Sequence, residues 1–125
     1  MDHKRIRVLI VDDHELFAGA LKLLLDDSDD VEVVGVAHDG DEAVDLAASS
    51  SPEVILMDVG LPGMDGFEAA RRLLEIRRGT KIVALTARSE DEVRADAEAA
   101  GMVGYLSKDH VDETVVAAIL RAAST

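Results

Sequence analysis

The sequence predicts an α/β domain built on a parallel β-sheet with helices on both faces. Runs rich in Val, Ile and Leu alternate along the chain with segments whose apolar residues recur at helical spacing. Continuously apolar strands are typical of parallel sheets buried on both faces. Strands that alternate with helices form βαβ units with right-handed crossovers. Because 125 residues suit one such unit, we expect residues 1–125 to form a single domain.

The first predicted strand covers residues 6–11, an apolar run that ends at Asp12. The following segment predicts a helix, and we expect its buried face to carry the residues at helical spacing, which are Leu16, Ala20, Leu23 and Leu24. The acidic segment 26–30 interrupts this pattern and predicts a solvated turn.

Further strand and helix cycles follow. The predicted strands cover residues 31–37, 54–57, 81–85 and 103–106. Each is followed by a helix with an apolar stripe, and the stripes are Ala43, Leu46 and Ala47; Phe67, Ala70 and Leu74; Val93, Ala97 and Ala100; and Val111, Val115, Ala118 and Ile119. Local signals mark helix ends: a turn at Asp39-Gly40, an S-x-x-E capping box from Ser89 to Glu92, and terminating glycines at Gly79 and Gly101.

The composition excludes several classes of protein. The 26 acidic residues outnumber the 13 basic residues, and the net charge of -13 argues against direct binding of nucleic acid or an anionic membrane. The absence of cysteine excludes disulfides and thiolate metal sites. Because no apolar run resembles a signal peptide or approaches the roughly 20 residues of a membrane span, we expect a cytoplasmic protein.

Five chemically reactive or charged residues lie where predicted strands end. They are Asp12, Asp13, Asp58, Thr86 and Lys108. In open parallel α/β sheets, ligands bind outside the carboxyl ends of the strands. We therefore expect these side chains to share one crevice.

The three carboxylates of this set predict a divalent cation. Such a cluster is unfavourable unless a cation neutralises it, and Mg²⁺ prefers hard oxygen ligands of this kind. The expected ligands are Asp12, Asp13, Asp58 and the backbone carbonyl of Gly60. An alternative for Asp12 needs no metal, because Asp12 with Glu15 could form a helix N-cap and its reciprocal partner.

Phosphoryl chemistry fits the remaining members of the set. An Asp58 carboxylate can attack phosphorus and form an acyl phosphate, while a Thr86 hydroxyl and a Lys108 ammonium can bind phosphoryl oxygens. The alternatives are structural: a turn Asp58, a strand-end Thr86 and a surface Lys108. His14, in the first turn of a helix, is expected to be exposed and is left outside the site.

Five short segments occur at these strand ends in chain order. They are Val11-Asp12-Asp13-His14, Leu56-Met57-Asp58, Leu61-Pro62-Gly63-Met64-Asp65-Gly66, Thr86-Ala87 and Gly104-Tyr105-Leu106-Ser107-Lys108. Together they resemble the receiver domain of bacterial two-component response regulators, over essentially the whole chain. The first and last segments look most like receivers that precede a LuxR-type helix-turn-helix output domain.

This resemblance implies a flavodoxin-like (βα)5 three-layer sandwich with strand order 2-1-3-4-5. It implies that Asp58 takes a phosphoryl group from a phosphohistidine on a sensor histidine kinase, with Mg²⁺ held by Asp12, Asp13 and Asp58. Thr86 and Lys108 would bind the phosphoryl oxygens.

The resemblance also implies a switch. Thr86 would move inward on phosphorylation and Tyr105 would move toward the space it leaves, which would reshape the face formed by the last two helices and the last strand. Tyr105 has a structural alternative, in which the ring merely covers the edge of the core. A homodimer formed on phosphorylation is a further expectation, and DNA contact would require an output domain beyond Thr125.

Three positions depart from common receiver patterns. Asp109 follows Lys108 where many receivers have proline, so we make no prediction for that peptide bond. Gly60 and Arg88 occupy positions that modulate loss of the phosphoryl group in this family, and a glycine offers no side chain to position water.

The function implied is a signalling switch that modifies itself, by phosphorylation and autodephosphorylation, and is not a turnover enzyme. Two alternatives stay open. A haloacid dehalogenase-like phosphatase would also use Asp, Thr, Lys and magnesium, but its signature is Asp-x-Asp after the first strand, where this chain has Asp12-Asp13-His14. A pseudo-receiver would use the fold as a scaffold without phosphorylation.

Overall fold

The computed structural model describes residues 4–61, 65–87 and 90–125. Its parallel strands are ordered β2-β1-β3-β4-β5. The strands are β1 (Ile6–Val11), β2 (Val31–Ala37), β3 (Val54–Asp58), β4 (Lys81–Thr86) and β5 (Gly104–Ser107). The helices are α1 (Glu15–Asp26), α2 (Gly40–Ser50), α3 (Gly66–Ile76), α4 (Glu90–Ala99) and α5 (Val111–Ala123). The expected flavodoxin-like fold and its strand order are confirmed.

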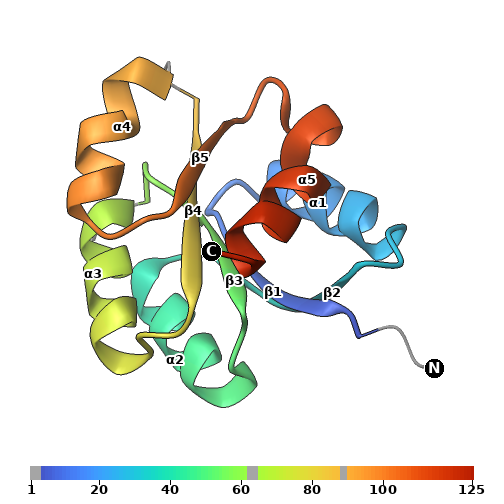
Figure 1. The fold of residues 1–125 in the computed structure, drawn as a ribbon, viewed down its shortest axis with the longest axis horizontal. Helices are drawn as coiled ribbons and strands as arrows, with labels where there is room; N and C mark the ends of the chain where they lie inside the picture. Colours follow the sequence, from blue (N-terminus) through green and yellow to red (C-terminus); the bar gives the residue numbers. More distant parts are fainter. Residues whose placement is uncertain (1–3, 62–64, 88–89) are drawn as a thin grey trace.

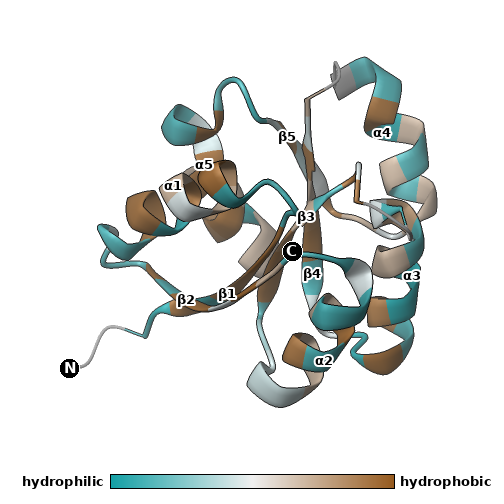
Figure 2. Cartoon of the chain, turned by 180° about the vertical axis from the view of Figure 1, so that it is seen from behind, coloured by the Kyte–Doolittle hydropathy of each residue, from teal (hydrophilic) through white to brown (hydrophobic). Residues whose placement is uncertain are grey.

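The sheet lies between two helical layers. Figure 1 shows α1 and α5 on one face and α2, α3 and α4 on the other. The strands supply apolar side chains to both layers, so that Leu9 and Val11 pack with the α2–α4 layer while Val8 and Ile10 pack with α1 and α5. In Figure 2 the hydrophobic colour runs along the central strands, whereas the helices carry both hydrophilic and hydrophobic colour. This burial on both faces explains why the strands read as continuous apolar runs.

The strand order places the site. From β1 the chain passes to β2 on one side and then to β3 on the other side, with Val11 beside Ala37 and also beside Met57. Such a switch point leaves a crevice at the carboxyl ends of the strands. Asp12 and Asp58, the residues next along their strands, therefore come together.

The edge strand β2 is irregular. Val8 pairs with Val33 but Leu9 pairs with Gly35, so Val34 is an extra residue that forms a bulge. A Cβ at Gly35 would lie 3.3 Å from Leu9 Cδ1, which explains the small residue next to the bulge.

The face of α1 that packs on the sheet differs from the prediction. Its buried residues are Ala18, Leu21 and Leu25, whereas Leu16 is 90% exposed and Leu23 is 73% exposed. The helix has apolar residues almost all round, so helical spacing fits more than one stripe. Periodicity predicted the helix correctly but could not fix which stripe faces the core.

Two predicted helix ends also need correction. Asp39 is the N-cap of α2, accepting from the Glu42 backbone N–H at 2.8 Å, so Gly40 begins the helix and is not part of a separate turn. Helix α3 ends at Ile76 and not at Gly79. The Arg77 N–H bonds to the Leu73 carbonyl, and a turn then connects to β4 without a left-handed glycine.

Other predictions hold. The stripe Val93, Ala97 and Ala100 is buried, and Gly101 follows α4 with φ +84°, a conformation that favours glycine.

Some residues named in the sequence analysis lie outside the described ranges. They are Arg88, Ser89 of the predicted capping box, and the Pro62-Gly63-Met64 part of the third motif. In the described ranges, none of the helices has both the length and the apolar character needed to cross a membrane.

Candidate functional site

The carboxyl ends of β1 and β3 bring three acidic side chains together. Asp12, Asp13 and Asp58 each offer a carboxylate oxygen, and these oxygens lie within 4.8 Å of one another. Asp12 is fully buried and Asp58 is 6% exposed, whereas Asp13 faces solvent. The expected carboxylate cluster therefore forms, with one member open to solution.

The local backbone fixes two of these carboxylates. Asp12 Oδ1 accepts from the His14 N–H at 2.9 Å, and Asp58 Oδ1 accepts from the Gly60 N–H at 3.0 Å. The N-cap of α1 is His14, which makes no side-chain cap, so the alternative that Asp12 caps this helix is wrong. His14 is exposed, as expected. One oxygen of each buried carboxylate is thus held in place and the other points to a different partner.

That partner is Lys108, in the connection between β5 and α5. Its Nζ lies 2.7 Å from Asp12 Oδ2 and 3.3 Å from Asp58 Oδ2. The Lys108 N–H bonds to the Thr86 carbonyl at 2.9 Å, which anchors the residue to the end of β4. The side chain is only 14% exposed, so the alternative of a surface lysine is wrong. No cis peptide bond occurs in the described ranges, so the Lys108–Asp109 peptide is trans.

The charges in the crevice do not balance. The cluster holds three carboxylates, and the ammonium of Lys108 contacts two of them, Asp12 and Asp58. Although Asp12 Oδ2 is close to that ammonium, it is buried without a well-directed hydrogen bond. Buried acceptors are normally satisfied, and adjacent carboxylates repel. A hard divalent cation would relieve both costs, so the donor set fits Mg²⁺.

Thr86 and Tyr105 lie on neighbouring strands beside this crevice. Asp58 pairs with Leu85, so fully buried Thr86 is one residue further along β4. Tyr105 pairs with Ala84, and Thr86, two residues after Ala84, presents its side chain to the same face of the sheet. The register therefore places the proposed switch pair on one face.

The Tyr105 ring is held by a residue that the sequence analysis missed. Arg94 on α4 donates from Nε to the Tyr105 hydroxyl at 2.8 Å, and its guanidinium lies 5.6 Å from the ring centroid. The hydrogen bond to Tyr105 raises the pKa of Arg94 above its ordinary value. The ring also packs against the core of the α2–α4 layer, as the structural alternative for Tyr105 predicts.

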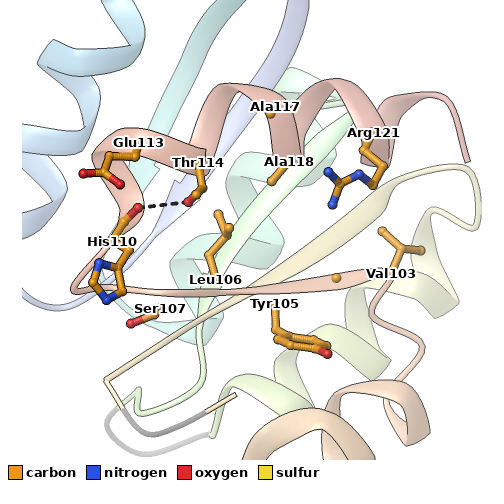
Figure 3. A pocket seen from close by; sticks show the side chains of 11 residues that line it. Val103, Tyr105, Leu106, Ser107, His110, Glu113, Thr114, Ala117, Ala118 and Arg121 are labelled. Carbon is orange, nitrogen blue, oxygen red and sulfur yellow. Dashed lines mark hydrogen bonds between the residues drawn. The ribbon is translucent and has the colours of Figure 1, made fainter. Parts of the chain in front are cut away.

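A groove of about 510 Å³ lies between β5 and α5, away from the carboxylates. Figure 3 shows Leu106 on the α5 side of β5 and Tyr105 on the opposite side, with Arg121 at one end of the groove and His110 at the other. A movement of β5 would change the shape of this groove.

Comparison with known proteins identifies the family. The family model of the response regulator receiver domain matches residues 8–120. The chain belongs to this family. Receiver domains of response regulators are signalling modules of two-component systems, so the haloacid dehalogenase-like phosphatase alternative is set aside.

The curated relatives are response regulators, and one of them is named as a regulator of transcription. Response regulator UvrY of Escherichia coli (strain K12) is 40% identical over 114 residues, covering 91% of this chain and 52% of its own length. Transcriptional regulatory protein LiaR of Bacillus subtilis (strain 168) is 42% identical over 119 residues, covering 95% and 56%. The chain thus spans about half the length of these curated relatives.

Solved structures agree with this assignment. A two-component response regulator of the LuxR family from Aurantimonas sp. SI85-9A1 superposes with a TM-score of 0.91 at 28% identity, over 97% of this chain and 86% of that one.

Proposed function

We propose that this receiver domain, residues 1–125, is a phosphorylation-controlled switch whose phosphoacceptor is Asp58. The observation that carries the proposal is the setting of Asp58: a nucleophilic carboxylate at the end of β3, 3.3 Å from the Lys108 ammonium and clustered with Asp12 and Asp13. A carboxylate attacks an anionic donor readily only where positive charge offsets the repulsion. The crevice supplies one cation itself and has the ligands for another.

Mg²⁺ is the proposed second cation. Asp12, Asp13, Asp58 and the Gly60 carbonyl would hold it, and the buried Asp12 Oδ2 without a well-directed hydrogen bond supports this ligand set. When bound, the ion supplies positive charge that allows an anionic phosphodonor to approach the carboxylates.

The proposed donor is a phosphohistidine on a sensor histidine kinase. A carboxylate oxygen of Asp58 forms a bond to phosphorus while the phosphorus–nitrogen bond breaks, and the electron pair of that bond stays on the imidazole, which takes up a proton. Lys108 and the Thr86 hydroxyl bind oxygens of the transferred group. Lys108 is already in contact with Asp58, so little rearrangement is needed.

Phosphorylation is proposed to reach the surface through Thr86 and Tyr105. The modification adds about -1.5 to -2 charge and three strong acceptor oxygens, which draw the Thr86 hydroxyl toward Asp58. Tyr105 then moves along the shared face of the sheet, which requires loss of its hydrogen bond from Arg94. The groove between β5 and α5 changes shape as a result.

This switch can be followed directly, because Tyr105 is the only tyrosine and the chain has no tryptophan. We expect the ring signals of Tyr105 in NMR spectra, and the intrinsic fluorescence, to change when Asp58 is phosphorylated. Arg94→Ala removes the hydrogen bond to the Tyr105 hydroxyl. In the unmodified protein it should therefore move both the ring signals and the fluorescence part of the way toward their values in the phosphorylated protein. Ring signals that stay unchanged on phosphorylation would contradict the switch.

The wider setting is inferred from relatives. The family implies a cognate histidine kinase, and the name of LiaR supports control of an output domain that regulates transcription. We propose a cytoplasmic location and a homodimer that forms on phosphorylation. Gly60 has no side chain that could position water near the acyl phosphate, so the rate of autodephosphorylation has to be measured.

The deciding experiment is intact mass measurement after incubation with acetyl phosphate. We expect one phosphoryl addition that requires Mg²⁺ and is absent from Asp58→Asn. Asp39→Asn is a matched control, because Asp39 caps α2 and is not a member of the carboxylate cluster, and asparagine caps equally well. No addition to wild type, with a donor active on another receiver, would favour the scaffold function of a pseudo-receiver.

A further inference from the structure

We propose that Phe17 is a positioning residue that holds the Lys108 ammonium over the crevice; this inference rests on the proposed function of Asp58. Lys108 Nζ lies 4.7 Å from the centroid of the Phe17 ring. A cation within about 6 Å of a ring centroid, over its face, is attracted by the electron density of the ring. The contact joins α1 to the connection after β5, two segments far apart in the sequence.

The surroundings strengthen this contact. Phe17 is partly buried and packs against the core formed by α1, α5 and the sheet, which restricts the ring. The Lys108 side chain is 14% exposed, so its ammonium has lost much of its water. Cation–π attraction is stronger when the cation is partly desolvated. The neighbouring residue Leu16, by contrast, is 90% exposed.

An aromatic ring suits the chemistry better than a further carboxylate would. Lys108 must keep its positive charge for the phosphoryl group, and another acidic side chain would neutralise it. Its contacts with Asp12 and Asp58 are also open to competition, since a metal ion draws on both carboxylates and phosphorylation modifies Asp58. Neither a metal ion nor a phosphoryl group binds the ring. Phe17 is therefore the contact that persists while Lys108 exchanges a carboxylate for a phosphoryl oxygen.

The test compares Phe17→Leu, which keeps an apolar side chain but removes the ring, with Phe17→Tyr, which keeps the ring. Leu16→Ala is a control on the same helix. With Mg²⁺ and limiting acetyl phosphate, we expect Phe17→Leu to be phosphorylated about threefold to tenfold more slowly, the range that cation–π strengths allow. Phe17→Tyr and Leu16→Ala should react at the wild-type rate.

A second measurement does not depend on phosphorylation. The ring current of Phe17 should displace the NMR signals of the Lys108 ε-methylene in the unmodified, metal-free protein. We expect Phe17→Leu to abolish this displacement and Phe17→Tyr to retain it. The amide spectrum of each variant shows whether it is folded.

The outcomes separate this inference from the proposed function. The positioning role is supported if Phe17→Leu is phosphorylated more slowly and also loses the ring-current displacement of the Lys108 signals, while Phe17→Tyr keeps the wild-type rate and the displacement. A Lys108 signal unchanged in Phe17→Leu overturns it, as does an unchanged rate or an equal loss of rate in both variants. If wild type accepts no phosphoryl group, the proposed function fails and the positioning role falls with it, while the displacement still decides whether the ring contacts Lys108.

Discussion

At the amino end of the sheet Thr80 and Glu53 are paired with neighbouring groups, although the buried Nε of Arg77 in the same region has no hydrogen-bond partner. At the carboxyl end two buried carboxylates, Asp12 and Asp58, share the single ammonium of Lys108. At the amino end the Thr80 hydroxyl donates to the Pro52 carbonyl at 3.1 Å, and the Glu53 backbone bonds to Arg7 on one side and Lys81 on the other. At the carboxyl end Asp12 Oδ2 has no well-directed hydrogen bond.

This difference separates stability from function. Satisfied polar groups lower the free energy of the fold, while groups whose charges repel raise it. Under the proposed function, Mg²⁺ would supply the positive charge that the carboxylates at the carboxyl end lack. Changes at the two ends of the sheet should therefore have different consequences for stability and for phosphorylation.

Gly66→Ala should have the largest effect on stability. A Cβ at Gly66 would overlap the Asp58 carbonyl oxygen and lie 2.6 Å from Val59 Cα, and backbone atoms cannot easily move aside. We expect a loss of about 3 kcal/mol, the upper end of the usual cost of overpacking, measured by urea unfolding. Gly79→Ala, near the amino end, meets no atom within 4 Å and should be nearly neutral. Equal effects of the two substitutions would contradict this account of the β3–α3 connection.

Magnesium should stabilise the carboxyl end. At a concentration 100 times its dissociation constant, a ligand that binds only the folded state adds about 2.7 kcal/mol to the free energy of unfolding. Thermal unfolding with Mg²⁺ and with EDTA measures this gain. Asp13→Asn removes an exposed ligand without disturbing the buried pair of Asp12 and Lys108, and should lose most of the gain. An undiminished gain in Asp13→Asn would place the ion elsewhere.

Lys108→Met should destabilise the metal-free protein. It leaves buried Asp12 without a cationic partner, and removing one partner of a buried pair costs about 3–5 kcal/mol. Because the crevice is open at Asp13, we expect about 2 kcal/mol by urea unfolding in EDTA, below that range. Magnesium should restore part of the loss.

Lys22→Met provides the matched control for this substitution. The pair of Lys22 and Asp26, at 2.6 Å, lies on the exposed surface of α1. We expect it to contribute no more than about 0.5 kcal/mol. A comparable loss for both lysines would show that the buried position of Lys108 is of no energetic consequence.

Apart from the controls, Thr80→Val should have the smallest effect, and it should act on stability alone. It removes the hydroxyl that bonds to the Pro52 carbonyl in a buried site, at a cost of about 1 kcal/mol. Thr80→Ser keeps the hydroxyl and is the control. Phosphorylation of Asp58 by acetyl phosphate should keep its wild-type rate, and a slower reaction would mean that the two ends of the sheet are coupled.

The strands and the carboxylate cluster could be predicted because their signals are local. A strand buried on both faces is apolar throughout, so Asp12 and Asp58 mark the ends of β1 and β3 unmistakably. The cluster then follows from the geometry of parallel sheets, in which the carboxyl ends of neighbouring strands meet. The family resemblance supplied the strand order, which alternation alone does not determine.

Other features could not be predicted because they depend on distances across the fold. The buried face of α1 was wrongly predicted, since Leu16 and Leu21 fit helical stripes equally well and only packing distinguishes them. Arg94 and Phe17 were missed because nothing in their local sequence indicates contact with Tyr105 or Lys108. Each contact joins segments brought together only by tertiary structure.

The bulge at Val34 has a consequence for how copies of the domain behave at high concentration. Strand β2 is at one edge of the sheet, where unpaired backbone groups could accept a strand from another molecule. The extra residue disrupts the regular spacing of these groups, and Glu32 adds an exposed charge to the same strand. The irregular edge therefore hinders neighbouring molecules from joining their sheets into fibrils.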